Sequence, residues 1–303
     1  MRKTTRAHLL LALTALIWGV AFVAQDVAAD TLEPFTINAA RMGLAALALL
    51  PALRLKRPPA QASAGKRGTL LLGGFLCGVM LALGSAFQQL GIDQGTGAGK
   101  AGFITALYIV LVPVAGLFMG KKPRALVWVA VCLSAVGLYL LCVRDGFTLS
   151  RGDGLLLVCA LSFTGHILVV DHFSRRVDCL KMSFIQFAVT SALCALVAAF
   201  TETPSLTAIA ACWLPVLYAG VLSGGVGYTL QIIGQRDSDP TVASLILSLE
   251  SLFAVLAGWL LLGDALTPKE CLGCVLMMGG ILLSQLPGQG VEVRKCRSRS
   301  HEG

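Results

Sequence analysis

The feature that most constrains this chain is a series of ten apolar runs, each about 20 residues long, separated by short polar segments. A helix of about 20 residues is long enough to cross the hydrocarbon core of a bilayer. Of all residues, 56% are apolar and only 13% are charged, about half the charged fraction usual in soluble domains. We therefore expect an all-α polytopic membrane protein with ten transmembrane helices. The predicted spans are 8–25, 35–53, 69–90, 100–119, 124–143, 153–171, 180–200, 211–233, 241–262 and 268–286.

The basic residues predict how these helices are oriented. With the N-terminus inside, 19 of the 24 Lys and Arg residues fall on the cytoplasmic side and four on the opposite side, and Arg41 lies within the second span. Cytoplasmic loops carry such an excess, so both termini are expected in the cytoplasm. The net charge of +8 is spread over short loops, which argues against nucleic-acid binding. Cleavage of the first span as a signal peptide is disfavoured, because it would remove one member of an internal repeat.

That repeat relates the two halves of the chain. Ala15 to Trp18 in the first span matches Ala160 to Phe163 in the sixth, at an offset of 145. Gln88 in the third span matches Gln231 in the eighth at an offset of 143, and Pro123 matches Pro268 at 145. Each half contains five helices, an odd number, so the halves should cross the membrane in opposite senses, as in many secondary transporters. The predicted units are two five-helix repeats, 8–143 and 153–286, and a basic tail, 287–303.

Three stretches carry a resemblance to a known family. They are Trp18-Gly19, the FITALYIVLVPV run from Phe103 to Val114, and the SLILSLESLFAVLAGWLLLGD run from Ser244 to Asp264. Together with the repeat, they resemble the EamA branch of the drug/metabolite transporter superfamily, over about residues 8–286. The resemblance implies a secondary transporter of the bacterial cytoplasmic membrane that exports a small metabolite or amino acid. Where the family commonly has proline after Leu-Glu in the ninth helix, this chain has Ser251.

Glu250 is the first candidate for function, because it lies near the middle of the ninth span. A carboxylate there opposes insertion by about 2.5 to 3.5 kcal/mol, which the surrounding apolar residues outweigh. Such a side chain needs a protein or water partner and commonly marks a transport pathway. The alternative is an interhelical hydrogen bond that only stabilises the bundle.

Arg41 is the second charge within an apolar run, six residues inside the second helix. It could reach the outer interface with its long side chain, or it could attract an anionic group such as a carboxylate, which its fork of donors suits. Asn38 lies three residues earlier on the same helix face and could share that role.

Uncharged polar and aromatic residues complete the set of candidates. Gln88, Gln89 and Gln231 must face protein or a wet cavity, because unpaired amides are costly in hydrocarbon; they either line a cavity or only join helices. Aromatic walls could come from Tyr108, Tyr228, Trp18 and Phe163, although single aromatics often only pack. His166 is a candidate proton carrier, with a hydrogen-bonded packing role as the alternative.

Other classes of protein fit the sequence less well. A Gly-Lys-Ser/Thr phosphate loop is missing, which argues against an ATP-driven pump. A lipid-acting membrane enzyme would need clustered His, Asp or Cys at a membrane face, and a sensor or scaffold would need a sizeable soluble domain. Neither feature is present. We therefore expect no enzymatic activity, cofactor or metal; the partners expected are a small-molecule substrate, the lipid bilayer and protons as candidate coupling ions.

Overall fold

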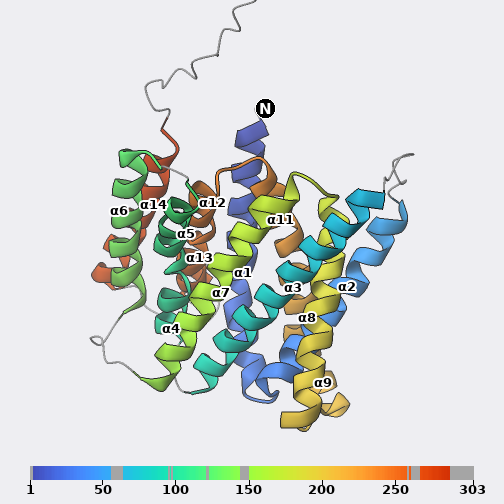
Figure 1. Ribbon diagram of the computed structural model, residues 1–303. Coiled ribbons are helices and arrows are strands. Elements are labelled where there is room, and N and C mark those ends of the chain that lie inside the picture. The colour runs from blue at the N-terminus through green and yellow to red at the C-terminus, as the bar shows by residue number, and fades with distance from the viewer. Residues whose placement is uncertain are drawn as a thin grey trace, which may run out of the picture.

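The computed structural model describes residues 3–55, 64–94, 96, 98–120, 123–143, 150–257, 259–260 and 267–286. Within these ranges the regular structure is entirely helical (Figure 1). The predicted basic tail, 287–303, lies outside the described residues, as does most of the loop between the second and third spans.

Within these ranges the first half of the chain forms α1 to α6, and the second half forms α7 to α14 together with the π-helix η1. The first six are α1 (Lys3–Ala29), α2 (Pro34–Leu55), α3 (Ala64–Asp93), α4 (Ala98–Thr105), α5 (Tyr108–Phe118) and α6 (Ala125–Cys142). The others within the described ranges are α7 (Arg151–Ser174), α8 (Cys179–Thr201), α9 (Leu206–Ala211), α10 (Trp213–Leu217), η1 (Tyr218–Tyr228), α11 (Thr229–Arg236), α12 (Pro240–Leu247), α13 (Leu249–Ala257) and α14 (Pro268–Ser284).

Most of the predicted spans coincide with helical stretches of sufficient length. Over the described residues, eight stretches are long and apolar enough to cross a membrane. The fifth predicted span is a shorter apolar helix, Ala125–Leu141, and the tenth is α14, with 17 residues. The structure thus supports eight of the ten predicted spans by length and composition.

The surface has the polarity expected of a protein in lipid. Large apolar side chains are exposed along the outer faces of the helices, whereas many polar side chains are buried between them. This reverses the usual distribution of a soluble protein. Examples of the exposed residues are Val129, Val136, Leu161, Leu196, Phe200 and Val275.

Three of the spans are not continuous α-helices. The fourth is interrupted between α4 and α5 and the ninth at Ser248, between α12 and α13, although no proline occurs at either break. The eighth consists of α10, the π-helix η1 and α11 in direct succession. π-helical segments are rare and often occur at functional sites.

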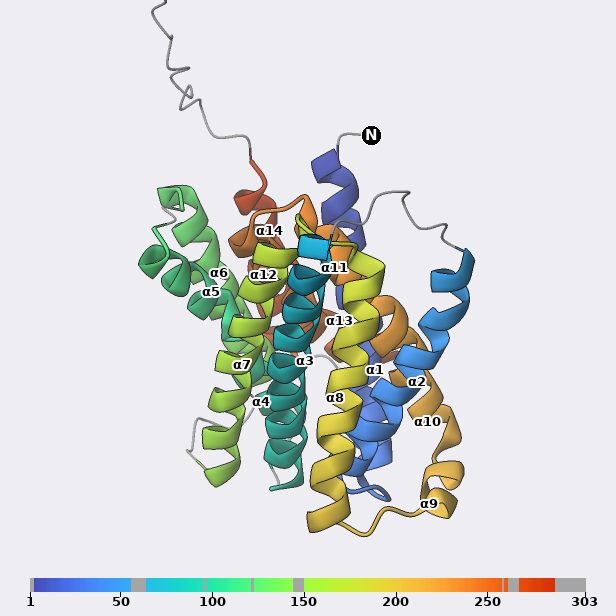
Figure 2. The same cartoon turned by 45° about the vertical axis from the view of Figure 1, so that its right-hand side comes forward.

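The helices of the two halves pack in a reciprocal pattern. α3 packs against α7 and α8, while the eighth span, which corresponds to α3 in the repeat, packs against α1 and α2. α2 packs against α8 and α6 against α14, so these corresponding helices meet directly. Figures 1 and 2 show that α1 and α7 run in opposite directions, and that α1 begins at the same end of the bundle at which α14 ends.

The contact between α6 and α14 depends on two glycines. A Cβ at Gly273 would lie 2.6 Å from the carbonyl oxygen of Gly137 and 2.7 Å from the amide of Leu141. Small residues of this kind let helix backbones approach closely in membranes. The close approach therefore leaves no room for a side chain at either glycine.

We expect Gly273→Ala to lower the free energy of unfolding of the purified protein by about 1 to 3 kcal/mol, because α6 and α14 must move apart to admit the methyl group. The melting temperature in detergent should fall by several degrees. Gly154→Ala is the matched control, since a Cβ there meets nothing within 4 Å. Equal melting temperatures for the two variants would contradict the close contact.

Candidate functional site

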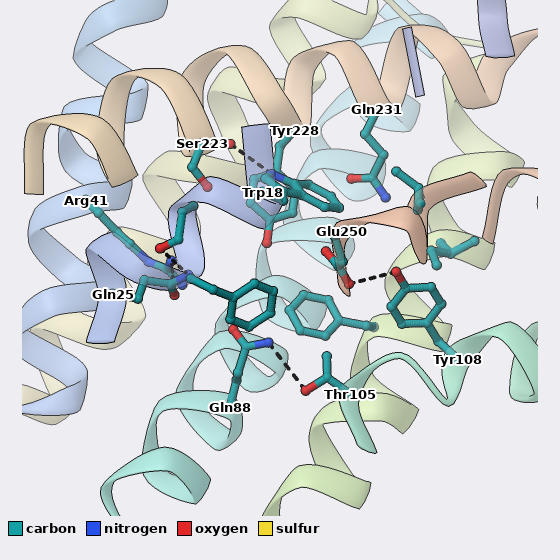
Figure 3. A pocket seen from close by; sticks show the side chains of 15 residues that line it. Trp18, Gln25, Arg41, Gln88, Thr105, Tyr108, Ser223, Tyr228, Gln231 and Glu250 are labelled. Atoms are coloured by element: carbon teal, nitrogen blue, oxygen red, sulfur yellow. Dashed lines mark hydrogen bonds between the residues drawn. The ribbon is translucent and has the colours of Figure 1, made fainter. Parts of the chain in front are cut away.

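A cavity between the two halves brings most of the candidate residues together (Figure 3). The empty space among its lining residues, including space open to solvent, is about 500 Å³. The lining residues come from the second half of α1, the first half of α2, the last part of α3, the junction of α4 and α5, the middle of α7, and the eighth and ninth spans. The cavity therefore extends from mid-bundle toward the end where α1 finishes and α7 begins. It is lined by Trp18, Ala21, Phe22, Gln25, Arg41, Gln88, Thr105, Tyr108, Phe163, Ile167, Ser223, Tyr228, Gln231, Leu247 and Glu250.

Arg41 forms one pole of the cavity and is held by two amide side chains. It is only 3% exposed; its Nε donates to Oδ1 of Asn38 at 2.9 Å and its Nη1 to Oε1 of Gln25 at 2.6 Å. No described carboxylate lies within salt-bridge distance of it. Because a guanidinium has five N–H donors, these two bonds orient Arg41 and leave donors for a ligand.

The helix that carries Arg41 is anchored at its first turn. The carboxylate of Glu202, at the end of α8, accepts hydrogen bonds from the backbone amides of Phe35 and Thr36, both at 2.7 Å. A carboxylate at a helix N-terminus satisfies free amides and complements the helix dipole. This contact fixes the start of α2 against α8, one and a half turns before Arg41.

Glu250 forms the opposite pole. It is 6% exposed, and its Oε1 accepts a hydrogen bond of 2.8 Å from the hydroxyl of Tyr108. The interruption at Ser248 places Glu250 in the first turn of α13, where a negative charge is stabilised by the helix dipole. The break in the ninth span therefore explains how a carboxylate is accommodated in the middle of the bundle.

Aromatic rings line the space between these poles. The rings of Trp18 and Tyr228 contact each other, with centroids 4.5 Å apart, and in the view of Figure 3 they lie between Arg41 and Glu250. The indole Nε1 of Trp18 donates to the carbonyl of Ser223 in η1, at 3.1 Å. The π-helix η1 thus supplies both the ring of Tyr228 and the carbonyl of Ser223, which orients Trp18.

Two glutamines line the cavity from equivalent positions of the repeat. Nε2 of Gln88 donates to Oγ1 of Thr105 at 3.4 Å. Gln231 is buried, and its Oε1 has no hydrogen-bond partner in the part of the chain that the structure describes. A buried amide oxygen without a donor is costly, so Gln231 is a natural acceptor for a ligand.

The cavity lies on the boundary between the two repeats. Trp18 and Phe163 correspond at an offset of 145, and both line it. α4 ends at Thr105 and α12 at Leu247, each three residues before Tyr108 and Glu250 respectively. Tyr108 and Glu250 therefore follow the breaks in the fourth and ninth spans at the same distance, and the hydrogen bond between them joins the two halves.

Seven of the ten predicted site residues line the cavity, and three do not. Asn38 does not line the cavity but accepts a hydrogen bond from Arg41, with which it shares a helix face. The Nδ2 of Asn38 donates to the carbonyls of Pro34 and Ser85. Gln89 is buried outside the cavity. His166 is also outside, 3.1 Å from Gln186. The seven lining residues are Trp18, Arg41, Gln88, Tyr108, Tyr228, Gln231 and Glu250.

The sequence analysis missed Gln25, Thr105 and Ser223. Gln25 could have been found by the argument applied to Gln88, because it is an amide near the end of an apolar helix. Thr105 and Ser223 have side chains that can bond to their own helix, so the sequence carries no comparable signal for them. Among the described residues, no group of three or more His, Cys, Asp or Glu could hold a metal ion.

Relatives of this chain are named as transporters. An uncharacterized transporter of Archaeoglobus fulgidus is 34% identical over 288 residues, covering 94% of this chain and 87% of the relative. The uncharacterized transporter YwfM of Bacillus subtilis is 26% identical over 288 residues, covering 89% of this chain and 90% of the relative. A solved crystal structure of a protein with 18% identity superposes with a TM-score of 0.76, covering 92% of this chain and 96% of that chain, which shows the shared fold.

The family assignment rests on both halves of the chain. The model of the EamA-like transporter family matches residues 5–143 and again residues 150–286. These matches show a two-repeat layout and account for nearly all the described residues. This chain therefore belongs to the EamA-like transporter family, and it is a multi-pass membrane transporter rather than an enzyme.

Proposed function

We propose that this protein is a secondary transporter that exports a small zwitterionic metabolite, such as an amino acid, by alternating access. The observation that carries the proposal is the presence of two buried, oppositely charged side chains, Arg41 and Glu250, in one cavity without an ion pair between them. A substrate with one carboxylate and one ammonium group complements both.

The burial of Arg41 and Glu250 supports a functional role for their charges. An ionised side chain in the interior of a membrane protein is costly and is retained chiefly where it has a function. Arg41 offers the planar fork that binds a carboxylate with two parallel hydrogen bonds. Glu250 can accept from an ammonium group, and the rings of Trp18 and Tyr228 provide apolar contact for the rest of a small substrate.

Glu250 is also the proposed site of proton coupling. Of the described side chains, only the hydroxyl of Tyr108 donates a hydrogen bond to it, so the carboxylate can bind either a proton or the ammonium group of the substrate. Competition between the two at one carboxylate would couple export of the substrate to entry of a proton.

In the proposed arrangement, the chain crosses the bacterial cytoplasmic membrane ten times in two inverted repeats, 8–143 and 153–286, with both termini inside. The opposite directions of α1 and α7 support the inversion (Figure 1), and the distribution of basic residues supports the orientation. The cavity then lies toward the outer side, in an outward-facing state.

Transport in proteoliposomes tests the proposed substrate class. We expect a panel of radiolabelled amino acids to contain at least one that accumulates by exchange against the same unlabelled amino acid. Its methyl ester and its decarboxylated amine should compete at least about tenfold more weakly, because each lacks one charge-assisted hydrogen bond. Equal competition by the ester, the amine and the amino acid would exclude recognition of a zwitterion.

Cysteine labelling on intact cells tests the orientation. Pro204 and Arg176 are exposed at opposite ends of α8, whereas Ser174 is fully buried and would not report its side. We expect an impermeant maleimide to label Pro204→Cys from outside and Arg176→Cys only after the membrane is permeabilised. The reverse pattern would invert the proposed topology and the side to which the cavity faces.

A further inference from the structure

A buried polar pair lies outside the cavity, between α7 and α8. Nε2 of His166 is 3.1 Å from Oε1 of Gln186, and both residues have no exposed surface. Among the described residues, neither Nδ1 of His166 nor Nε2 of Gln186 has a hydrogen-bond partner. Leaving buried polar atoms unpaired costs about 1 to 3 kcal/mol each, so this pair is poorly explained as a purely structural contact.

The repeat gives these two residues counterparts in the first half. α1 ends at Ala29 and α7 at Ser174, and α2 begins at Pro34 and α8 at Cys179. Each of these two pairs of corresponding helix ends is 145 residues apart, which is also the offset between Trp18 and Phe163. At that offset, His166 corresponds to Ala21 and Gln186 corresponds to Arg41.

Those counterparts have a known position, because Ala21 and Arg41 both line the cavity. They lie between mid-bundle and the end where α1 finishes. Since α7 runs opposite to α1 and α8 opposite to α2 (Figures 1 and 2), the equivalent positions in the second half lie toward the other end of the bundle. His166 and Gln186 therefore stand at the positions equivalent to Ala21 and Arg41, and the His166 ring contacts the cavity-lining ring of Tyr228.

Contacts of the eighth span with α1 and α7 cover this region. Oγ1 of Thr14 donates to the carbonyl of Gly227 at 3.2 Å, and Nε2 of Gln235 donates to the carbonyl of Ile167 at 3.3 Å. The ring of Tyr228 meets the His166 ring edge-on, with centroids 5.9 Å apart. Separation of this span from α1 and α7 would therefore uncover the His166–Gln186 pair.

We infer that His166 and Gln186 line the second half of the transport path and contact the substrate in the state that opens to the opposite side. The inference rests on the alternating access proposed above. The pseudo-two-fold axis of an inverted repeat lies in the membrane plane, so the counterparts of the residues that line the cavity toward one side are placed to line the path when it opens to the other side. The unpaired atoms of His166 and Gln186 then serve as hydrogen-bonding groups for a passing substrate.

The two corresponding residue pairs, Ala21 with Arg41 and His166 with Gln186, differ in charge. Arg41 presents a guanidinium to the cavity, whereas its counterpart Gln186 is a neutral amide. A substrate carboxylate is therefore bound more tightly while it faces Arg41 than while it faces Gln186, because charge-assisted hydrogen bonds are about twice as strong as neutral ones.

Cysteines at the matched positions Ala21 and His166 test the inference. The probe is a membrane-impermeant cationic methanethiosulfonate, applied to sealed membrane vesicles of both orientations, with modification of each peptide quantified by mass spectrometry. We expect Ala21→Cys to react only from the side at which α1 ends, and His166→Cys only from the opposite side. Ala160→Cys, fully buried on the same helix as His166, is the control and should react at least tenfold more slowly than His166→Cys.

The outcomes distinguish this inference from the proposed function. Labelling of Ala21→Cys with no labelling of His166→Cys from either side overturns the inference and leaves the outward cavity intact. Protection of both cysteines from both sides contradicts the cavity as a transport site and the inference with it. Equal modification rates of Ala160→Cys and His166→Cys would mean that the packing around α7 is loosened generally. That result would also overturn the inference. If His166→Cys does not fold, Gln186→Cys reports the same surface and should react from the same side.

Discussion

Glu250→Gln should leave the protein inserted and folded but reduce transport at least about 30-fold. Glutamine keeps the size of the side chain and can still accept the hydrogen bond from Tyr108, which is 2.8 Å long in the native protein. It removes the charge that is proposed to hold an ammonium group or a proton, and losing a buried charged partner typically costs 2 kcal/mol or more. Initial rates of counterflow in proteoliposomes, normalised to the amount of folded protein, provide the measurement.

Glu270→Gln is the matched control for this variant. Glu270 is also buried, but it forms a capping box with Thr267 at the start of α14. Glutamine serves in a capping box as well, so transport should remain near the native rate.

The possible results for Glu250→Gln separate three roles. Loss of folded protein would indicate a structural hydrogen bond. Normal folding with undiminished transport would refute any role in the transport cycle. Reduced transport that still depends on a pH gradient would leave substrate contact intact and exclude proton coupling through this carboxylate.

Arg41→Lys should reduce transport at least about tenfold although the positive charge is kept. Lysine cannot donate simultaneously to Asn38 and Gln25 in the geometry of the guanidinium, nor present a planar fork to a carboxylate. The informative measurement is selectivity: the preference for an amino acid over its methyl ester should largely disappear. Arg54→Lys, at the exposed end of the same helix, should preserve both rate and preference.

A second substitution distinguishes binding from folding at this position. Arg41→Met removes the donors and leaves the oxygens of Asn38 and Gln25 buried without them, so it should also lower the melting temperature. An Arg41→Lys variant with native transport and native selectivity would exclude Arg41 as the carboxylate-binding residue.

The sequence predicted the spans well because each helix must present apolar side chains to lipid over nearly its full length. It did not predict the interruptions at Thr105 and Ser248 or the π-helix before Thr229. Hydropathy measures composition, and the breaks in the fourth and ninth spans have no proline at them and interrupt runs that are apolar on average, so neighbouring helices determine the backbone path there.

Charge was the best guide to the site. Arg41 and Glu250 were identified because each is costly in hydrocarbon, and both line the cavity. His166 and Gln88 are similar signals in sequence, yet only Gln88 lines the cavity in this state. A single sequence encodes both the open and the closed side of a transporter, so it cannot indicate which polar residues face the cavity in one conformation.

The winding of η1 determines the direction in which its side chains point. Tyr218, at its start, donates to the carbonyl of Ile17 at 3.1 Å, while Tyr228, at its end, lines the cavity. A π-helix advances by a smaller angle per residue than the 100° of an α-helix. Conversion of even one turn to α geometry would rotate Tyr228 and Gln231 about the helix axis while Tyr218 stayed in place. The eighth span can thus redirect its cavity side chains by rewinding, without breaking its backbone or moving as a rigid body.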